Sequence, residues 1–155
     1  MKKLFLFAVA TLISTMIMAT ETITVSFTDA TVFGYENPAE NGKATKIESG
    51  STLTYQSINF DISYESGNGF RFFKSGADDD AGEIDLRAYV NSQMVISAPE
   101  GCLFTQMVIT GTNITSKYLS IEGYDSKTKT WTGNSEAITI DVIESTAHFK
   151  TIEIT

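Results

Sequence analysis

The chain has 155 residues, a formal net charge of −8 at pH 7 and one cysteine. This acidic balance, with no run of basic residues along the sequence, disfavours nucleic-acid binding because phosphate backbones are repelled. A single cysteine excludes an intrachain disulfide, so packing alone must stabilise the fold.

Residues 1–19 have the pattern of a secretory signal peptide. Lys2 and Lys3 precede the apolar run Leu4–Met18, and Ala19 is the small residue expected before a cleavage site. The run is shorter than the roughly 20 residues that span a bilayer, which favours cleavage over a membrane anchor. We therefore expect residues 20–155 to form a single exported domain, periplasmic or extracellular, without stable membrane insertion.

Most of the mature chain alternates apolar and polar residues with the period of two typical of half-buried β-strands. The clear cases, in chain order, are Thr22–Phe27, Ser57–Tyr64, Glu83–Val90 and Ala137–Val142. Shorter candidates are Ser51–Tyr55, Phe70–Phe73, Gln93–Ser97, Lys117–Glu122 and Phe149–Ile154. Leu103–Thr110 differs because it is apolar on both faces, which predicts a central strand covered on both sides.

Turn signals separate these segments. Asn41–Gly42 predicts a turn, Asn68–Gly69 is a dipeptide of the hairpin type, and Pro99–Gly101 suits a tight turn. No segment carries a helical apolar stripe, and Pro38–Asn41 allows at most one helical turn. The sequence therefore predicts an all-β, two-sheet antiparallel β-sandwich, jelly-roll-like, with eight or nine short strands.

Glu83 and Asp85 are the sharpest catalytic candidates, because residues two apart on a strand share a face. A retaining glycosidase needs two carboxyl groups about 5–5.5 Å apart. The segment resembles the Glu-x-Asp-x-x-Glu strand of jelly-roll endoglucanases of the laminarinase type. Arg87 and Ala88 stand where a further glutamate would be needed, so hydrolysis is the weaker alternative.

Asp78, Asp79 and Asp80, with Asp85 nearby, supply carboxylate oxygens of the kind that calcium prefers. Their spacing does not match an EF-hand, because Glu83 occupies the position of the required glycine. A structural calcium ion is the one cofactor that the sequence suggests. A solvated acidic loop is the alternative interpretation.

Trp131 is the only tryptophan and is flanked by threonines. An exposed indole ring gives a sugar a flat apolar surface, while polar neighbours orient its hydroxyl groups. The polar neighbours that we expect at such a site are Arg87, Tyr89, Asp125 and Asn134. The alternative is a tryptophan that closes the end of the sandwich.

The remaining reactive side chains give little support to nucleophilic catalysis. His148 is the only histidine, and we expect it to be a solvent-exposed residue at the start of the last strand. No serine or cysteine lies in a Gly-x-Ser-x-Gly elbow. Cys102 follows a turn, and we expect it to be a buried small apolar residue.

Two stretches together resemble a class of small secreted β-sandwich domains abundant in Bacteroidetes. The first runs through Leu86–Tyr89, Val95–Gly101 and Gln106–Thr110, and the second through Thr130–Gly133, Ala137–Ile140 and Phe149–Thr155. The resemblance covers residues 60–155 and implies a jelly-roll-like, carbohydrate-binding-module-like fold at the periplasm or exterior of a Gram-negative cell. It implies no particular activity.

These observations favour an exported, non-catalytic binding module for a polysaccharide or a cell-surface protein. One alternative is a structural or adhesive surface component that is held through edge strands and has no small ligand. The weaker alternative is a glycoside hydrolase that uses Glu83 and Asp85.

Overall fold

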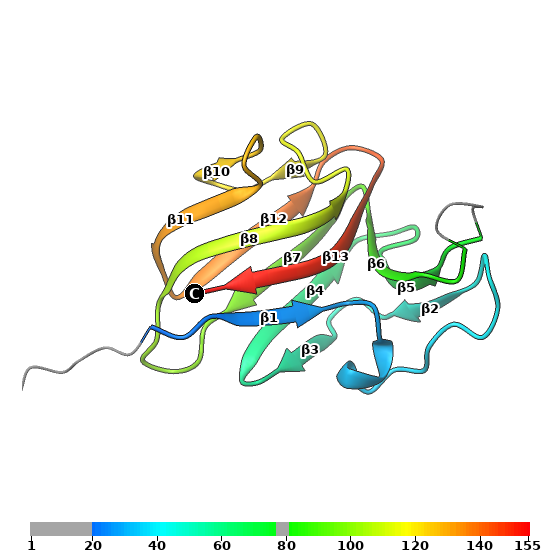
Figure 1. Cartoon of the computed structure of the whole chain (residues 1–155). Helices are drawn as coiled ribbons and strands as arrows, with labels where there is room; N and C mark the ends of the chain where they lie inside the picture. Colours follow the sequence, from blue (N-terminus) through cyan, green and yellow to red (C-terminus); the bar gives the residue numbers. More distant parts are fainter. Residues whose placement is uncertain (1–19, 77–80) are drawn as a thin grey trace, which may run out of the picture.

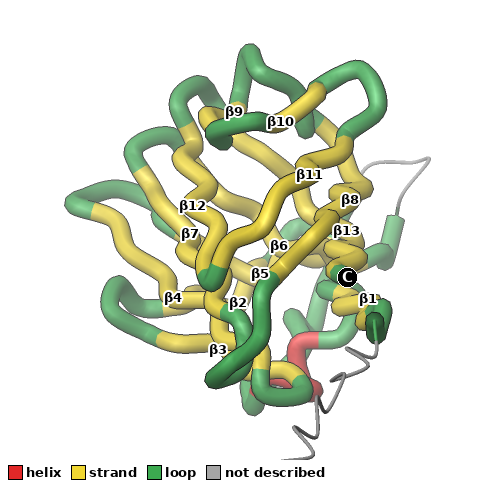
Figure 2. Tube along the Cα trace, turned by 90° about the vertical axis from the view of Figure 1, so that its left-hand side faces the viewer, coloured by secondary structure: helices red, strands yellow, loops and turns green. Residues whose placement is uncertain are grey.

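The computed structural model describes residues 20–76 and 81–155, which form an all-β sandwich with 13 strands and one short 3-10 helix. The strands are β1 (Ile23–Ser26), β2 (Ala44–Ile47), β3 (Thr52–Tyr55), β4 (Ile58–Tyr64), β5 (Phe70–Lys74), β6 (Ile84–Tyr89), β7 (Ser92–Ser97), β8 (Phe104–Thr112), β9 (Leu119–Ser120), β10 (Tyr124–Asp125), β11 (Thr130–Ser135), β12 (Ala137–Val142) and β13 (Thr146–Ile154). The helix η1 spans Ala30–Phe33. The two layers are seen together in Figure 2.

Both sheets are antiparallel, which confirms the predicted two-sheet sandwich. The eight-stranded sheet has the order β10-β11-β8-β13-β6-β5-β2, with β1 paired to β13. The five-stranded sheet has the order β3-β4-β7-β12-β9. Most connections pass from one sheet to the other (Figure 1). Strand β13 organises the larger sheet, because its first half pairs with β6 and its second half with β1.

The core lies between the sheets and follows the alternation of the sequence. On β4, Ile58, Phe60 and Ile62 are buried while the residues between them are exposed. Burying each large apolar side chain stabilises the fold by roughly 1.5–3 kcal/mol. On β6, Leu86 and Ala88 are fully buried, so the intervening residues face outward from the larger sheet.

The helix η1 covers one end of this core. The Asp29 carboxylate caps it by accepting hydrogen bonds from the backbone N–H and hydroxyl of Thr31, and these bonds lower the pKa of Asp29 below its ordinary value of 3.8. Gly34 ends the helix with φ at 81°, a conformation that glycine adopts readily. The Phe33 ring stacks on Phe27 at a centroid distance of 5.4 Å.

Pro38–Asn41, for which the sequence allows at most one helical turn, is not helical, since the only helix of residues 20–76 and 81–155 is η1. The chain makes a turn instead, closed by a hydrogen bond from Lys43 N–H to the Glu40 carbonyl. The turn predicted at Asn41–Gly42 is confirmed, with Gly42 at φ 75°.

The expected eight or nine strands are too few. β9 lies within the predicted Lys117–Glu122, and β11 was not expected as a strand. The polar stretch between Gly34 and Gln56 holds β2 as well as the predicted β3, and β10 has only two residues. Segments this short carry no periodic signal, and pairing with a neighbouring strand is what makes them strands.

The prediction that Leu103–Thr110 is covered on both faces is also wrong. Thr105 and Gln106 both donate their backbone N–H to the carbonyl of Thr155, at 2.7 and 3.2 Å. This irregularity, with a register shift against β11, turns Phe104 onto the core face. Leu103 precedes the strand and is 47% exposed.

Two turn residues have other surroundings than expected. Asn68–Gly69 does not form a hairpin, because β4 and β5 belong to different sheets. Gly69 leaves room for the Tyr64 ring that packs on it, at a φ of 55°. Cys102 is exposed rather than buried, since the turn that Pro99 closes carries it outward.

No helix within the described ranges has the length and apolar character needed to cross a bilayer. Residues 1–19, which carry the predicted signal peptide, lie outside the described residues.

Candidate ligand-binding site

The outward face of the larger sheet carries a row of basic side chains across four adjacent strands. Lys46 on β2 is paired with Arg71 on β5, Arg71 with Arg87 on β6, and Arg87 with His148 on β13. Their strand neighbours face the core, so these side chains point outward. The basic group that the linear sequence lacks is therefore assembled by the sheet.

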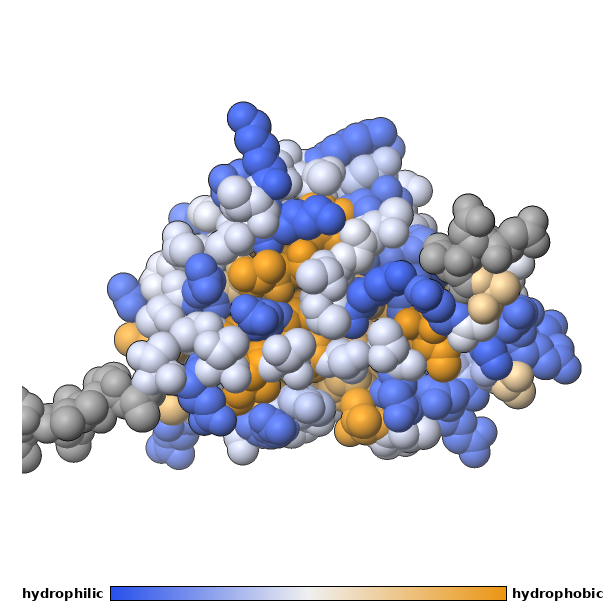
Figure 3. Space-filling model, viewed as in Figure 1, coloured by the Kyte–Doolittle hydropathy of each residue, from blue (hydrophilic) through white to orange (hydrophobic). Residues whose placement is uncertain are grey.

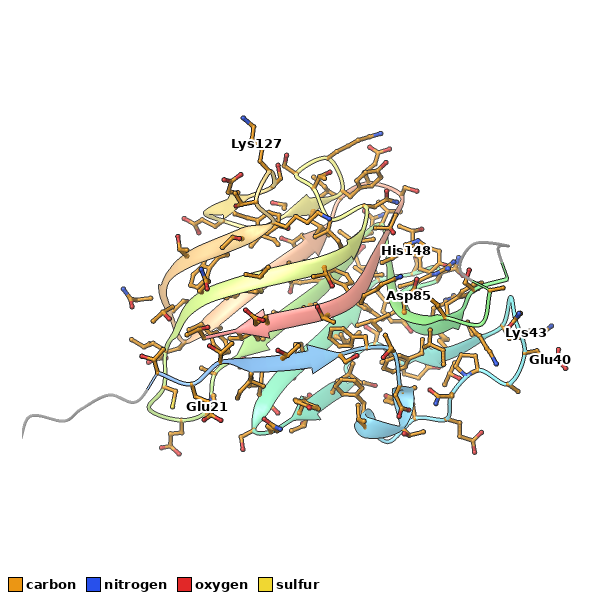
Figure 4. The ribbon with its side chains drawn as sticks, in the orientation of Figure 1. Glu21, Glu40, Lys43, Asp85, Lys127 and His148 are labelled. Carbon is orange, nitrogen blue, oxygen red and sulfur yellow. The ribbon has the colours of Figure 1, made fainter. Side chains whose placement is uncertain are left out.

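Asp85 lies inside this row and holds two of its members. Its Oδ1 accepts a hydrogen bond from Arg87 Nε at 2.9 Å, and its Oδ2 lies 3.2 Å from His148 Nδ1. Figure 4 shows Asp85 and His148 pointing toward each other from β6 and β13. Asp85 is only 8% exposed although it is on the outer face, so these two partners replace contacts that solvent would otherwise make.

The two arginines also lie over aromatic rings. The guanidinium carbon of Arg87 is 3.6 Å from the centre of the Phe73 ring, and that of Arg71 is 4.9 Å from the centre of the Tyr89 ring. Stacking of this kind attracts the cation to the ring and holds a planar guanidinium in a fixed orientation. In Figure 3 a hydrophobic patch lies among hydrophilic residues over β5 and β6. We call Arg71, Phe73, Asp85, Arg87, Tyr89 and His148 the outer-face array.

Further contacts surround the array. Arg71 donates from Nη2 to the side-chain oxygen of Asn68 at 2.7 Å and to its carbonyl at 3.0 Å. Its Nε is buried and has no hydrogen-bond partner among the described residues. Lys150 donates to Glu83 at 2.6 Å. Buried N–H donors without partners are rare in proteins, so the unpaired Nε–H of Arg71 lowers the stability of the fold and needs an explanation.

The structure brings together only part of the set predicted around Trp131. Arg87 and Tyr89 belong to the array, whereas Trp131, Asp125 and Asn134 lie on or beside β10 and β11. Trp131 is paired with the buried Met107 and therefore points into the sandwich. These residues do not form one platform.

Trp131 itself is 8% exposed. Its indole lies over Gly133, where an added Cβ would be 2.6 Å from Trp131 Cζ2, and against Gly123. Two glycines thus make room for the ring. One side of it lines a hollow of about 520 Å³ that also includes Asn134.

The predicted calcium ligands Asp78, Asp79 and Asp80 lie outside the described residues. Asp85 is described, and both of its oxygens contact Arg87 or His148. Within residues 20–76 and 81–155, no three His, Cys, Asp or Glu side chains are grouped to hold a metal ion.

The two carboxylates of the hydrolase hypothesis do share a face, as predicted, but both are engaged. Glu83 is paired with Lys150, and Asp85 has a partner at each oxygen. This arrangement leaves Asp85 without an oxygen free for a substrate. His148 is not the exposed, isolated residue that we expected, because its side chain is 22% exposed and contacts Asp85.

Sequence reasoning missed Phe73, Arg71 and His148 as parts of the site. Each lies on a different segment from Arg87, and only the strand pairing makes them neighbours. Comparisons of the chain with protein-family models, curated proteins and solved structures find no match. The case for a function therefore depends on the geometry.

Proposed function

We propose that the protein is a non-catalytic, exported binding module that holds a carboxylate-bearing glycan on the outer-face array. The observation that carries this proposal is the opposed pair Arg71 and Arg87, each stacked on an aromatic ring. A guanidinium presents a planar fork of N–H donors that matches a carboxylate, and stacking fixes its direction.

The aromatic rings support a sugar rather than a bare anion. Phe73 and Tyr89 are partly exposed on the same face, and aromatic rings provide apolar surface for the C–H face of a pyranose. Arg87 has no hydrogen-bond partner other than Asp85 among the described residues, so its remaining N–H groups are open to a ligand.

The overall charge of the protein further restricts the class of ligand that the array could bind. With a net charge of −8, the protein repels densely charged polymers such as nucleic acids. Much of the positive charge on this face is also offset by the carboxylates of Glu83, Glu48 and Asp85. Single carboxylates spaced along a sugar chain fit this balance better than a continuous polyanion.

The exported setting agrees with this function. The signal-peptide pattern of residues 1–19 and the resemblance to small secreted Bacteroidetes domains both favour a location where extracellular glycans are available. The alternative, an adhesive component without a small ligand, is favoured by Leu103, which is exposed beside an apolar hollow of about 280 Å³. Self-association that persists on dilution and ignores added glycan would support that alternative.

Calorimetric titration of residues 20–155 with hexuronic-acid oligosaccharides tests the proposal. The matched ligand is the same oligosaccharide with its carboxyl groups reduced to hydroxymethyl groups, which is neutral. We expect Arg71→Gln and Arg87→Gln to weaken uronate binding by about tenfold or more, as loss of a charge-assisted hydrogen bond does. Lys127→Gln is the charge-matched control, because this exposed lysine is far from the array in Figure 4 and should leave binding unchanged. Equal binding of both ligands would contradict the proposal.

A further inference from the structure

The outward face of the five-stranded sheet differs in character from the outer-face array. Four polar side chains form a row across adjacent strands: Ser63 on β4, Gln93 on β7, Asp141 on β12 and Ser120 on β9. Neighbouring strands are about 4.8 Å apart, so the row is about 14 Å long. Gln93 Nε2 donates to Asp141 Oδ1 at 2.7 Å, which fixes both side chains.

Two hollows meet at Asp141. One, of about 580 Å³, lies over the ends of β4, β7 and β12 and includes Ser63 and Gln93. The other, of about 520 Å³, lies between β12 and β11 and includes Thr139, Asn134 and Trp131. Asp141 lines both, so the hollows are neighbours along one surface.

We propose that these two hollows, which we call the Asp141 cleft, are a second binding site, which takes a neutral polysaccharide chain. The described residues that line them include the carboxylates of Glu65, Glu122 and Asp141 and no lysine or arginine. Such a surface repels an acidic polymer. Hydroxyl groups both donate and accept hydrogen bonds, so they suit a row of carboxylate, amide and hydroxyl side chains.

Trp131 contributes the apolar part of the cleft. Ligand sites combine aromatic surface with a few placed polar groups, and the indole here packs on Gly133 and lines the hollow. This tryptophan does not form an open stacking platform, because it is 8% exposed. It forms part of the wall of a cleft, and the side chains that can form hydrogen bonds with a ligand there come from β7 and β12.

This site is separate from the outer-face array, because none of the residues that line the two hollows belongs to the array. A module with both would hold an acidic chain on one side and a neutral chain on the other. Binding at one site is therefore expected to survive loss of the other.

The test uses soluble neutral polysaccharides: a mixed-linkage glucan, a xylan and a galactomannan. Trp131 is the only tryptophan, so a shift or intensity change in its emission reports occupation of the hollow that it lines. We expect at least one polysaccharide to change this emission and to bind in affinity electrophoresis.

Asp141→Asn keeps the shape of the side chain and should weaken binding about tenfold or more. The control is Asp61→Asn, which alters a carboxylate on the same face outside both hollows and should change affinity less than about twofold. The Arg87→Gln variant should still bind the neutral polysaccharide. This result would separate the proposal for the Asp141 cleft from the proposal for the outer-face array. The proposal would be overturned if none of the three polysaccharides bound, or if their binding depended on Arg87 instead. It would also be overturned if the cleft took only a divalent cation or a basic peptide.

Discussion

Arg71 and Arg87 lie directly opposite each other on two hydrogen-bonded antiparallel strands, and each guanidinium lies over an aromatic ring of the other strand. Like charges opposed in this way disfavour strand pairing. Among the residues that the structure describes, Asp85 is a carboxylate partner for Arg87 alone of this pair, while Arg71 bonds to neutral oxygens of Asn68. An arrangement that costs stability without an evident structural gain is typical of a functional site.

The asymmetry of this pair predicts that the two arginines contribute unequally to stability. Arg87→Gln should lower the free energy of unfolding by about 2 kcal/mol, because it leaves the poorly exposed Asp85 without its cation. Arg71→Gln removes the opposed charge and should change stability by less than about 0.5 kcal/mol, or raise it. Urea denaturation of both variants measures the difference. Equal losses would show that the opposition of charges is not the governing effect.

Trp131 should emit at short wavelength and resist quenching by acrylamide, because it is 8% exposed. Gly133→Ala would place a Cβ 2.6 Å from the indole, which must then shift. We expect a red-shifted emission and a stability loss of about 1–3 kcal/mol, as in an overpacked core. Thr132→Ala, at an exposed neighbouring position, should leave the emission as it is. A quenchable, long-wavelength signal in the unaltered protein would contradict the position of the ring.

Tyr124 predicts a loss of stability in alkaline solution. Burial, with a smaller contribution from the charge of Asp125, raises the pKa of Tyr124 from 10.0 to about 12. Between these pH values the folded state keeps a proton that the unfolded state has lost, so the free energy of unfolding falls as pH rises. Below about pH 10 the contribution of Tyr124 is fully present.

The check on Tyr124 is the difference between two stability curves. Tyr124→Phe should have a shallower decline in stability than the unaltered protein between pH 10 and about 12. Both proteins share their other titrating groups, which therefore cancel. Parallel curves would place the phenol in a more hydrated environment than the structure gives it.

Cys102 should react with a thiol reagent in the native protein, without denaturant, because its side chain is exposed. Cys102→Ser should change stability by less than about 0.5 kcal/mol, as expected at an exposed position. Slow labelling that becomes fast only on unfolding would restore the buried position that the sequence favoured.

The fold was predictable where periodicity was strong. In Ser57–Tyr64 the alternation alone identifies the buried Ile58, Phe60 and Ile62. In Glu83–Val90 it identifies Leu86 and Ala88, but Val90 is 41% exposed. β2 and β10 were not predictable as separate strands because short segments owe their strand structure to their neighbours. The bulge at Thr105 was hidden too, since it depends on pairing with Thr155, 50 residues away.

Only part of the candidate site could be predicted from the sequence. The alternation of β6 correctly places Asp85, Arg87 and Tyr89 on one face. Their partners come from β5 and β13, and no local pattern says which strands lie beside β6. For the same reason Trp131 could not be assigned to the inner face, since that depends on its pairing with Met107.

Binding of a carboxylate-bearing glycan to the outer-face array is tested most directly by titrating the isotope-labelled protein with a hexuronic-acid oligosaccharide and following its two-dimensional amide NMR spectrum. We expect shift changes to concentrate on β5 and β6, around Arg71 and Arg87, and the side-chain Nε–H signals of these arginines to move. Shift changes confined to the five-stranded sheet, or none at ligand concentrations that saturate binding, would contradict it.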